Sequence, residues 1–381
     1  MRAQLFLIIV SLVGCKWTDF DDLADSTWVR STKKPNIGSR NYATAILGVT
    51  PSGASGGQLA VVSDDTPDFG TLDYAEDGTD TVGPVDLKLG QHSIAVLTDP
   101  PIFATDGTGK IAIAERSTMG GNISLVFGPV SSPAGLQFSA ATAVPDAVAF
   151  NGADVIVAAG ATLYTEQTAP TPIACTGMDN MNQPLLVAAL ATDSSNLWVW
   201  SRGGALFSYP LSALAPCNGG MLPAPGNAFT AMGFSPGNGA HIHIVGTYAI
   251  LTAHASSSRA GEVYVVDLTS LAAVGSPIAV DGLKSSAIAV IGGKTYLVLG
   301  IPDRSVDGLA AGQVELHEFD PATGTLSTTT ALVLNDAEPE AGELFGRGVT
   351  TMKFNNQTIL VVSADSEVFA YFKTTLYDAL P

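Results

Sequence analysis

The sequence predicts an all-β protein, namely a seven-bladed β-propeller of four-stranded antiparallel blades. Three observations carry this prediction. Seven short apolar runs recur along the chain, alternating apolar and polar segments follow several of them, and no stretch shows helical periodicity over three turns. The composition agrees, because 40 Gly, 22 Pro and only 14% charged residues are typical of short strands joined by tight turns.

Each of the seven apolar runs is expected to form a strand that is buried on both faces, because the runs lack polar alternation. They are also too short, and too tightly flanked by Gly, Asn and Asp, to be core helices. They recur about every 40 to 60 residues, which is the length of a four-stranded blade. The runs span residues 59–62, 111–114, 155–158, 197–200, 248–251, 296–299 and 359–362.

Further strands are expected on either side of these runs. From axis to rim, the order expected across a blade is a first strand, a continuous apolar strand, an alternating strand and an irregular outer segment. The preceding strands are expected at 42–49, 93–97, 147–150, 186–190, 286–291 and 349–354. The following strands, which alternate more often, are expected at 121–127, 261–267, 312–319 and 367–372.

Tandem β-sandwiches are the alternative architecture, because one sandwich needs only about 100 residues. The recurrence of roughly 50 residues favours a closed ring instead, and closure removes exposed sheet edges. Divided by seven, the chain from Cys15 onward gives about 52 residues per unit, which suits seven blades. The segments 27–30 and 376–380 compete to complete the last blade, and the sequence does not decide between them.

The N-terminus has the pattern of a bacterial secretion signal. One basic residue, Arg2, precedes an apolar run from Leu5 to Val13 that is too short to span a bilayer. The segment Leu12-Val13-Gly14-Cys15 resembles the lipobox of bacterial lipoproteins, in which the Cys becomes the lipid-modified first residue. An ordinary signal peptide is the alternative. Lys16 stands where inner-membrane lipoproteins carry Asp, which favours delivery to the outer membrane.

Three segments follow from this pattern. Residues 1–14 are expected to be a lipoprotein signal peptide, 15–26 the lipidated Cys15 with an acidic tether, and 27–381 the β-propeller. A lipid on Cys15 would anchor the protein to a membrane of the cell envelope, facing the periplasm or the cell surface. The net charge of −18 argues against a nucleic-acid partner, which requires a basic surface.

Two cysteines, Cys175 and Cys217, lie in the body of the chain. An exported compartment permits disulfides, and an even pair fits a single bridge. A Cys175–Cys217 disulfide is therefore expected, with two free buried thiols as the alternative.

Several units resemble FG-GAP repeats, the blades of the integrin-α-type β-propeller. Phe345-Gly346 precedes a strand pair as in that family, residues 297–302 resemble the strand end L-V-V-G-A-P, and residues 261–265 and 312–316 resemble G-x-V-Y-V. The resemblance is clear in the C-terminal units and rests on spacing alone in the N-terminal ones. It implies a scaffold for binding or adhesion.

The sequence departs from this family at the calcium loops. Calcium-binding blades carry an Asp-x-Asp-x-Asp-Gly loop before the continuous strand, because calcium needs at least six oxygen ligands. The corresponding loops here, at 50–57, 292–293 and 355–356, lack that density of carboxylates. No metal or cofactor is therefore predicted.

Two groups of side chains that could bind a metal or a sugar are expected to have structural roles instead. His241 and His243, together with His254, supply three nitrogens but no carboxylate or Cys at a spacing diagnostic of zinc, so ordinary strand histidines are expected. Trp198 and Trp200 are expected in the core rather than on a surface that stacks carbohydrate. No catalytic residue is predicted.

The predicted function is a lipid-anchored scaffold of the cell envelope that binds a protein or a glycan, for adhesion or assembly, without catalysis. The alternative is a surface hydrolase or lyase that acts on polysaccharide at the axial face of the propeller. Carboxylates or histidines with shifted pKa values that converge at one mouth of the channel would favour the enzyme.

Overall fold

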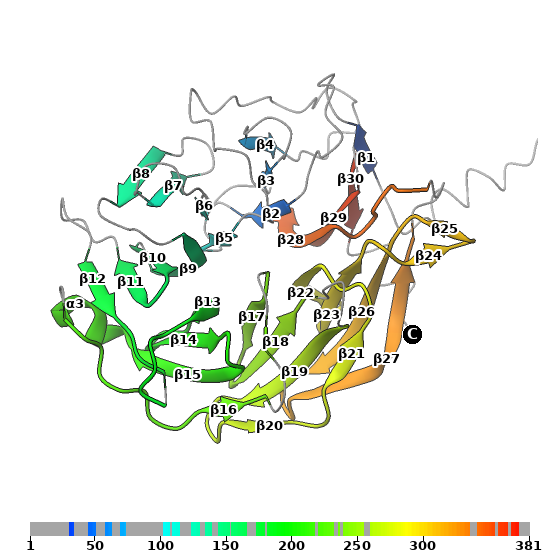
Figure 1. Ribbon diagram of the computed structural model, residues 1–381. Coiled ribbons are helices and arrows are strands. Elements are labelled where there is room, and N and C mark those ends of the chain that lie inside the picture. The colour runs from blue at the N-terminus through cyan, green and yellow to red at the C-terminus, as the bar shows by residue number, and fades with distance from the viewer. Residues whose placement is uncertain are drawn as a thin grey trace, which may run out of the picture.

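A computed structural model describes most of the body of the 381-residue chain, and its strands dominate (Figure 1). The described residues are 30–33, 45–50, 58–62, 69–73, 102–106, 109–114, 123–129, 134–138, 144–152, 154–165, 173–179, 181–217, 220–231, 235–236, 239–254, 260–335, 341–354, 357–364 and 367–372. Among them, no helix is both long enough and apolar enough to cross a membrane.

The described strands form seven sheets of three or more strands and one separate hairpin, and neighbouring strands within a sheet are antiparallel. The first three sheets are β2 (Ala45–Val49), β3 (Gln58–Val62) and β4 (Phe69–Asp73); β5 (Ile102–Thr105), β6 (Lys110–Ala114), β7 (Ile123–Pro129) and β8 (Ala134–Phe138); and β9 (Pro145–Asn151), β10 (Asp154–Ala159), β11 (Thr162–Thr165) and β12 (Ile173–Thr176).

The next two sheets follow in the middle of the chain, and the first of them has a long connection between its third and fourth strands. They are β13 (Val187–Thr192), β14 (Asn196–Ser201), β15 (Ala205–Pro210) and β16 (Phe229–Thr230); and β17 (His241–Val245), β18 (Tyr248–Ala253), β19 (Gly261–Asp267), β20 (Ala272–Ala273) and β21 (Ile278–Val280). A 3-10 helix, η1 (Leu211–Ala213), and the short helix α3 (Leu214–Cys217) lie between β15 and β16.

The last two sheets combine the strands between residues 285 and 372 with the N-terminal strand β1. They are β22 (Ser285–Ile291), β23 (Lys294–Ile301), β26 (Gln313–Asp320) and β27 (Thr325–Leu334); and β28 (Gly348–Phe354), β29 (Gln357–Ala364), β30 (Glu367–Phe372) and β1 (Arg30–Lys33). The hairpin of β24 (Ser305–Val306) and β25 (Leu309–Ala310) extends the connection between β23 and β26.

The seven predicted apolar runs all fall on the second strand of a sheet, namely β3, β6, β10, β14, β18, β23 and β29. Burial on both faces is clear in β14, where Leu197, Trp198, Val199 and Trp200 are at most 4% exposed. Trp198 and Trp200 are therefore core residues, as predicted. A strand packed between neighbouring sheets has no solvent face, which explains the absence of alternation.

The first strand of each sheet is the innermost, and the predicted positions agree for β2, β9, β13, β22 and β28. The predicted strand at 93–97 lies outside the described residues, and the innermost strand of that sheet is β5. The innermost strand β17 contains His241 and His243.

The innermost strands contact one another in turn, in the order β2, β5, β9, β13, β17, β22 and β28, and β28 returns to β2 (Figure 1). The backbone N–H of Gly48 donates to Thr350 Oγ1 at 2.8 Å, and that of Lys353 donates to Thr50 Oγ1 at 2.8 Å. These contacts close the described sheets into a ring, which tandem sandwiches do not form. The number of blades remains a prediction, because residues 74–101 lie outside the described part of the chain.

The N-terminal segment completes the last sheet. β1 pairs with β30, and the partners run from Arg30 opposite Ala370 to Lys33 opposite Glu367. The outer strand thus lies at 30–33, next to the predicted segment 27–30, whereas the competing segment 376–380 lies outside the described residues. This pairing covers the outer edge of β30 and joins an N-terminal strand to the C-terminal sheet.

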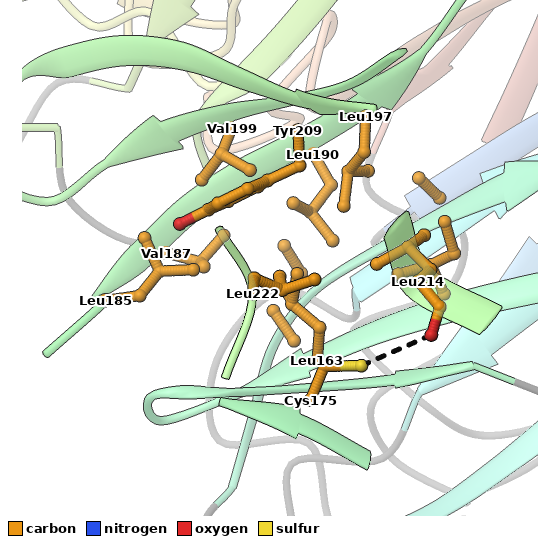
Figure 2. Packing of buried hydrophobic residues seen from close by; sticks show 14 of the residues in the cluster. Leu163, Cys175, Leu185, Val187, Leu190, Leu197, Val199, Tyr209, Leu214 and Leu222 are labelled. Atoms are coloured by element: carbon orange, nitrogen blue, oxygen red, sulfur yellow. Dashed lines mark hydrogen bonds between the residues drawn. The ribbon is translucent and has the colours of Figure 1, made fainter. Parts of the chain in front are cut away.

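Apolar side chains fill the space between neighbouring sheets. Figure 2 shows the cluster between the β9–β12 and β13–β16 sheets, where Leu163, Leu197 and Val199 are fully buried. Each such side chain stabilises the fold by about 1.5–3 kcal/mol relative to an exposed position. This packing holds each sheet at a fixed angle to the next.

Candidate functional site

The innermost strands surround an axial cavity of about 1230 Å³. Residues of β2, β5, β9, β13, β17, β22 and β28 all line it. Small-molecule sites usually have volumes of about 300–1,000 Å³, so this space accommodates a ligand of several rings or sugar units. The axial cavity is therefore the first candidate site.

The ends of the cavity differ because the innermost strands run in the same direction. The Ser285 hydroxyl donates to the Gly346 carbonyl at 2.8 Å, and further along the same two strands the Thr351 hydroxyl donates to the Ile288 carbonyl at 3.1 Å. The first residues of β17, β22 and β28 therefore lie at the same end of the cavity. We call this end the first mouth; its lining includes Gly239, His241, His254, Lys284, Asp303 and Arg347.

Three histidines pack together at the first mouth. His241 and His243 lie two apart on β17, so their rings leave the same face of the strand. Their ring centroids are 6.1 Å apart and the rings are nearly parallel, with an interplanar angle of 10°. His254 follows β18, and its ring centroid lies 5.3 Å from that of His241.

Burial keeps all three imidazoles uncharged. It lowers the pKa of His241 to about 4, and burial together with His241 lowers the pKa of His243 to about 3. Burial, His241 and Lys284 hold the pKa of His254 well below its usual range. Protein atoms surround the rings, yet part of their surface is accessible because they line the cavity. At pH 7 they therefore act as neutral donors and acceptors of hydrogen bonds.

Hydroxyl groups join this cluster to the neighbouring sheet. His243 Nε2 lies 2.8 Å from Ser286 Oγ on β22, and Ser286 Oγ lies 2.6 Å from Thr252 Oγ1. In contrast, His254 Nε2 is buried and has no hydrogen-bond partner in the described structure. Leaving such an atom unsatisfied costs about 1–3 kcal/mol, so a hydrogen bond to this nitrogen would stabilise the cluster.

Within the ranges that the structure describes, no group of three or more His, Cys, Asp or Glu side chains is arranged to hold a metal ion. The imidazole nitrogens of the cluster can donate or accept hydrogen bonds.

Two cations from adjacent sheets also line the first mouth. Lys284 directly precedes β22, and Arg347 directly precedes β28. The bond from Ser285 to the Gly346 carbonyl joins the residues next to them, so both backbones are held together here. Gly346 has a φ of +90°, a value that favours glycine, and the preceding Phe345 is fully buried. The Phe-Gly pair recognised in the sequence thus positions Arg347.

The carboxylates around the cavity have other roles. Asp146, at the start of β9, accepts a hydrogen bond from Arg202 Nη2 at 2.5 Å and from the Gly160 backbone N–H at 2.9 Å. Asp303 is exposed at the first mouth, and Asp106 lies at the opposite end of the cavity. The described carboxylates therefore do not complete an acid–base pair with the histidines.

A second candidate surface lies around the disulfide. Cys175 on β12 and Cys217 on α3 form a disulfide with Cα atoms 5.7 Å apart, in agreement with the prediction. The Cys175 sulfur also lies 3.4 Å from the Leu214 carbonyl oxygen (Figure 2). Nearby, three large apolar side chains are exposed, which we call the disulfide-side surface: Met181 (68%), Leu186 (54%) and Met221 (61%).

Hydrogen bonds hold the segments of this surface side by side. The Asp179 carboxylate accepts the backbone N–H groups of Met181 and Gln183, each at 2.8 Å. The backbone N–H of Leu222 donates to the Thr176 carbonyl at 2.9 Å, which fixes the strand next to Met221. The Tyr209 hydroxyl donates to the Met178 carbonyl, and burial raises the pKa of this hydroxyl. The exposed side chains are thus presented by an ordered backbone.

Sequence reasoning identified the histidines but not their surroundings. Lys284, Ser286 and Arg347 come from strands that are remote from His241 in the sequence, and they carry no motif beyond the neighbouring Phe-Gly pair. The predicted lipidation site, Cys15, lies outside the described residues.

Comparison with known proteins shows the fold alone. Neither a family model nor a curated protein sequence matches the chain. A chain of the crystal structure of the mitotic checkpoint complex has a TM-score of 0.56 at 10% identity, covering 91% of this chain and 95% of that one. BBS1N in complex with ARL6DN has a TM-score of 0.55 at 11% identity, covering 91% and 97%. These neighbours are β-propellers, in agreement with the predicted fold class.

Proposed function

We propose that this protein is a lipid-anchored β-propeller of the bacterial cell envelope, a scaffold of the FG-GAP type that binds protein partners. The observation that carries the proposal is the disulfide-side surface, where Met181, Leu186 and Met221 are exposed on a cross-linked backbone. Exposed apolar groups favour association, and a rigid backbone loses little entropy when a partner binds.

Both structural neighbours come from protein complexes by their titles, which supports a role in assembly for a propeller of this shape. The resemblance of the C-terminal units to integrin-α-type repeats supports the same role. A glycan is the alternative partner. It is disfavoured at the disulfide-side surface, because methionine and leucine side chains supply no hydrogen bonds to sugar hydroxyls.

Affinity purification from the cell envelope tests the proposal. The wild-type protein should recover a constant set of partner proteins, and the triple variant M181S/L186S/M221S should lose them. The control variant L309S/V333S removes two exposed apolar side chains elsewhere, Leu309 (38%) and Val333 (43%), and should retain the partners. Equal recovery with the triple variant, or loss with both variants, would contradict binding through this surface.

Membrane anchoring is tested separately. The variant C15S removes the sulfur that would carry the lipid, so the protein should move from the membrane fraction to the soluble fraction and lose incorporation of labelled palmitate. K16S is the matched control and should remain at the membrane. Membrane association of C15S without a lipid would contradict the anchor.

A polysaccharide-acting enzyme is the second candidate, because three histidines with lowered pKa values converge at the first mouth. Such low values make them poor bases near neutral pH, since general bases work best with a pKa near the working pH. The test is release of new chain ends from envelope polysaccharide by wild type but not by H243A. Equal release by both proteins would exclude a catalytic His243.

A further inference from the structure

The axial cavity is separate from the surface proposed to bind proteins. Most of its polar side chains lie on one arc of the wall, where the sheets that begin with β17, β22 and β28 meet. The two cations of this arc are notable in a chain with only 17 Lys and Arg residues and a net charge of −18. A long-range negative field opposes the entry of anions, so any affinity for them must come from local groups.

From this arrangement we propose that the first mouth is a binding site for a ligand that carries carboxylate or phosphate groups, and that binding is coupled to protonation of the histidine cluster. The site consists of His241, His243 and His254 together with Lys284, Ser286 and Arg347. The cavity behind it holds the rest of the ligand.

Each part of the site has a function in this proposal. Lys284 and Arg347 supply positive charge, and an arginine fork binds carboxylate or phosphate oxygens in two-point contacts. The Ser286 hydroxyl and the imidazole N–H groups supply neutral donors. His254, whose buried Nε2 has no partner in the described structure, adds positive charge beside a bound anion when its ring takes up a proton.

The uptake of a proton when an anion binds follows from the electrostatics of the histidine cluster. Burial and the neighbouring charges keep the imidazoles neutral, and Lys284 contributes to this effect at His254. A bound anion supplies the missing opposite charge, so it raises the pKa of the nearest histidine. Affinity should therefore increase as the pH falls.

Other charged groups that face the cavity do not reverse the expected increase in affinity at lower pH. Among the described lining residues these are Asp146, Asp303 and Asp106. Asp146 accepts hydrogen bonds from Arg202 and Gly160, Asp303 is exposed, and Asp106 lies at the other end.

Isothermal titration calorimetry on the full chain tests the proposal with three probes, each built from three linked units. Trigalacturonate provides carboxylates, tripolyphosphate provides phosphates, and maltotriose is the uncharged control. At least one anion should bind, and maltotriose should not. The preferred anion identifies the ligand chemistry. Failure of both anions at millimolar concentration, or equal binding of maltotriose, would overturn the proposal.

A matched pair of lysine variants locates the site. K284Q should weaken binding of the preferred anion about tenfold, which corresponds to one lost charged contact. K294Q makes the same change of charge in the β22–β23 hairpin, where Lys294 pairs with Glu318 at 3.1 Å, and should leave the affinity unchanged. Equal effects of K284Q and K294Q would show that only the overall charge matters and would overturn the site.

The pH coupling is measured with trigalacturonate. The dissociation constant should decrease from pH 7.5 to pH 5.5, by up to about tenfold per pH unit for one proton taken up. The heat of binding should also differ between buffers of different ionisation enthalpy. The double variant H241Q/H254Q should bind with no pH dependence. A dissociation constant that does not change with pH in the wild type would overturn the coupling.

Discussion

Glu315 illustrates how single side chains are stabilised in the sheets. It lies on β26 with a side chain that is 14% exposed, and it accepts hydrogen bonds from Arg304 Nη2 and Gln313 Nε2, each at 3.1 Å. His317 Nε2 lies 3.4 Å from its other oxygen. The hydrogen bond with His317, followed by the charge of Arg304, lowers the pKa of Glu315.

The sign of the resulting pH dependence can be predicted. Because folding lowers this pKa, the carboxylate stabilises the protein above about pH 4.3, its value in the unfolded chain, and this contribution is lost as the pH falls through the lower folded value. E315Q should reduce the free energy of unfolding at pH 7 by about 1–3 kcal/mol and should lose less stability than wild type below pH 4. Urea unfolding at several pH values measures both effects.

Glu318 provides the control for this residue. It lies on the same strand and pairs with Lys294, but its side chain is 44% exposed. E318Q should change the free energy of unfolding by no more than about 1 kcal/mol, as exposed ion pairs do. Equal effects of E315Q and E318Q would show that burial of Glu315 and its partners does not add to the free energy of unfolding.

At the scale of an element, the Phe345-Gly346 turn joins two sheets and positions the first mouth. Gly346 has a φ of +90°, and a Cβ on it would lie 2.7 Å from the Gln313 carbonyl oxygen. G346A combines backbone strain with a clash and should cost about 2–4 kcal/mol. Gly293 has a φ of +83° with open space around it, so G293A should cost only about 1–2 kcal/mol. Thermal unfolding of both variants tests this difference, and an equal loss would contradict the close packing.

The contribution of the disulfide to the stability of the fold can also be measured. The disulfide joins residues 42 apart in the sequence, and closing a loop of this length stabilises a protein by about 2–4 kcal/mol. C175S/C217S should lower the melting temperature, and wild type in reducing agent should show the same decrease. A melting temperature that does not change on reduction would show that the bridge is dispensable for stability.

At the scale of the molecule, ring closure depends on the pairing of β1 with β30. Replacing residues 30–33 with Gly-Ser-Gly-Ser keeps the chain length but weakens this strand, so the last sheet should expose its edge. The free energy of unfolding should decrease by about 2–4 kcal/mol and light scattering should reveal association. The same replacement at 376–379, in the competing segment, is the control. A larger loss with the control would assign closure to the C-terminus.

The sequence predicted individual strands better than the tertiary contacts between them. The apolar run 197–200 lies on β14, because four successive apolar residues between turns have few alternatives to a buried strand. The pairing of Cys175 with Cys217 was also predictable, since the body of the chain contains only these two cysteines. In contrast, β5 (Ile102–Thr105) was not predicted, since it has only four residues and directly follows Pro100 and Pro101.

Local pattern and tertiary structure thus determined different properties of this protein. The sequence alone determined the class of the fold, because strand burial and turn formation depend on residues within a few positions of one another. Only the tertiary structure decided where the ring closes, that His254 joins His241, and that Lys284 and Arg347 face the same mouth. Those contacts join distant parts of the chain, as in the bond from Gly48 to Thr350 across 302 positions, and no local pattern encodes such a distance.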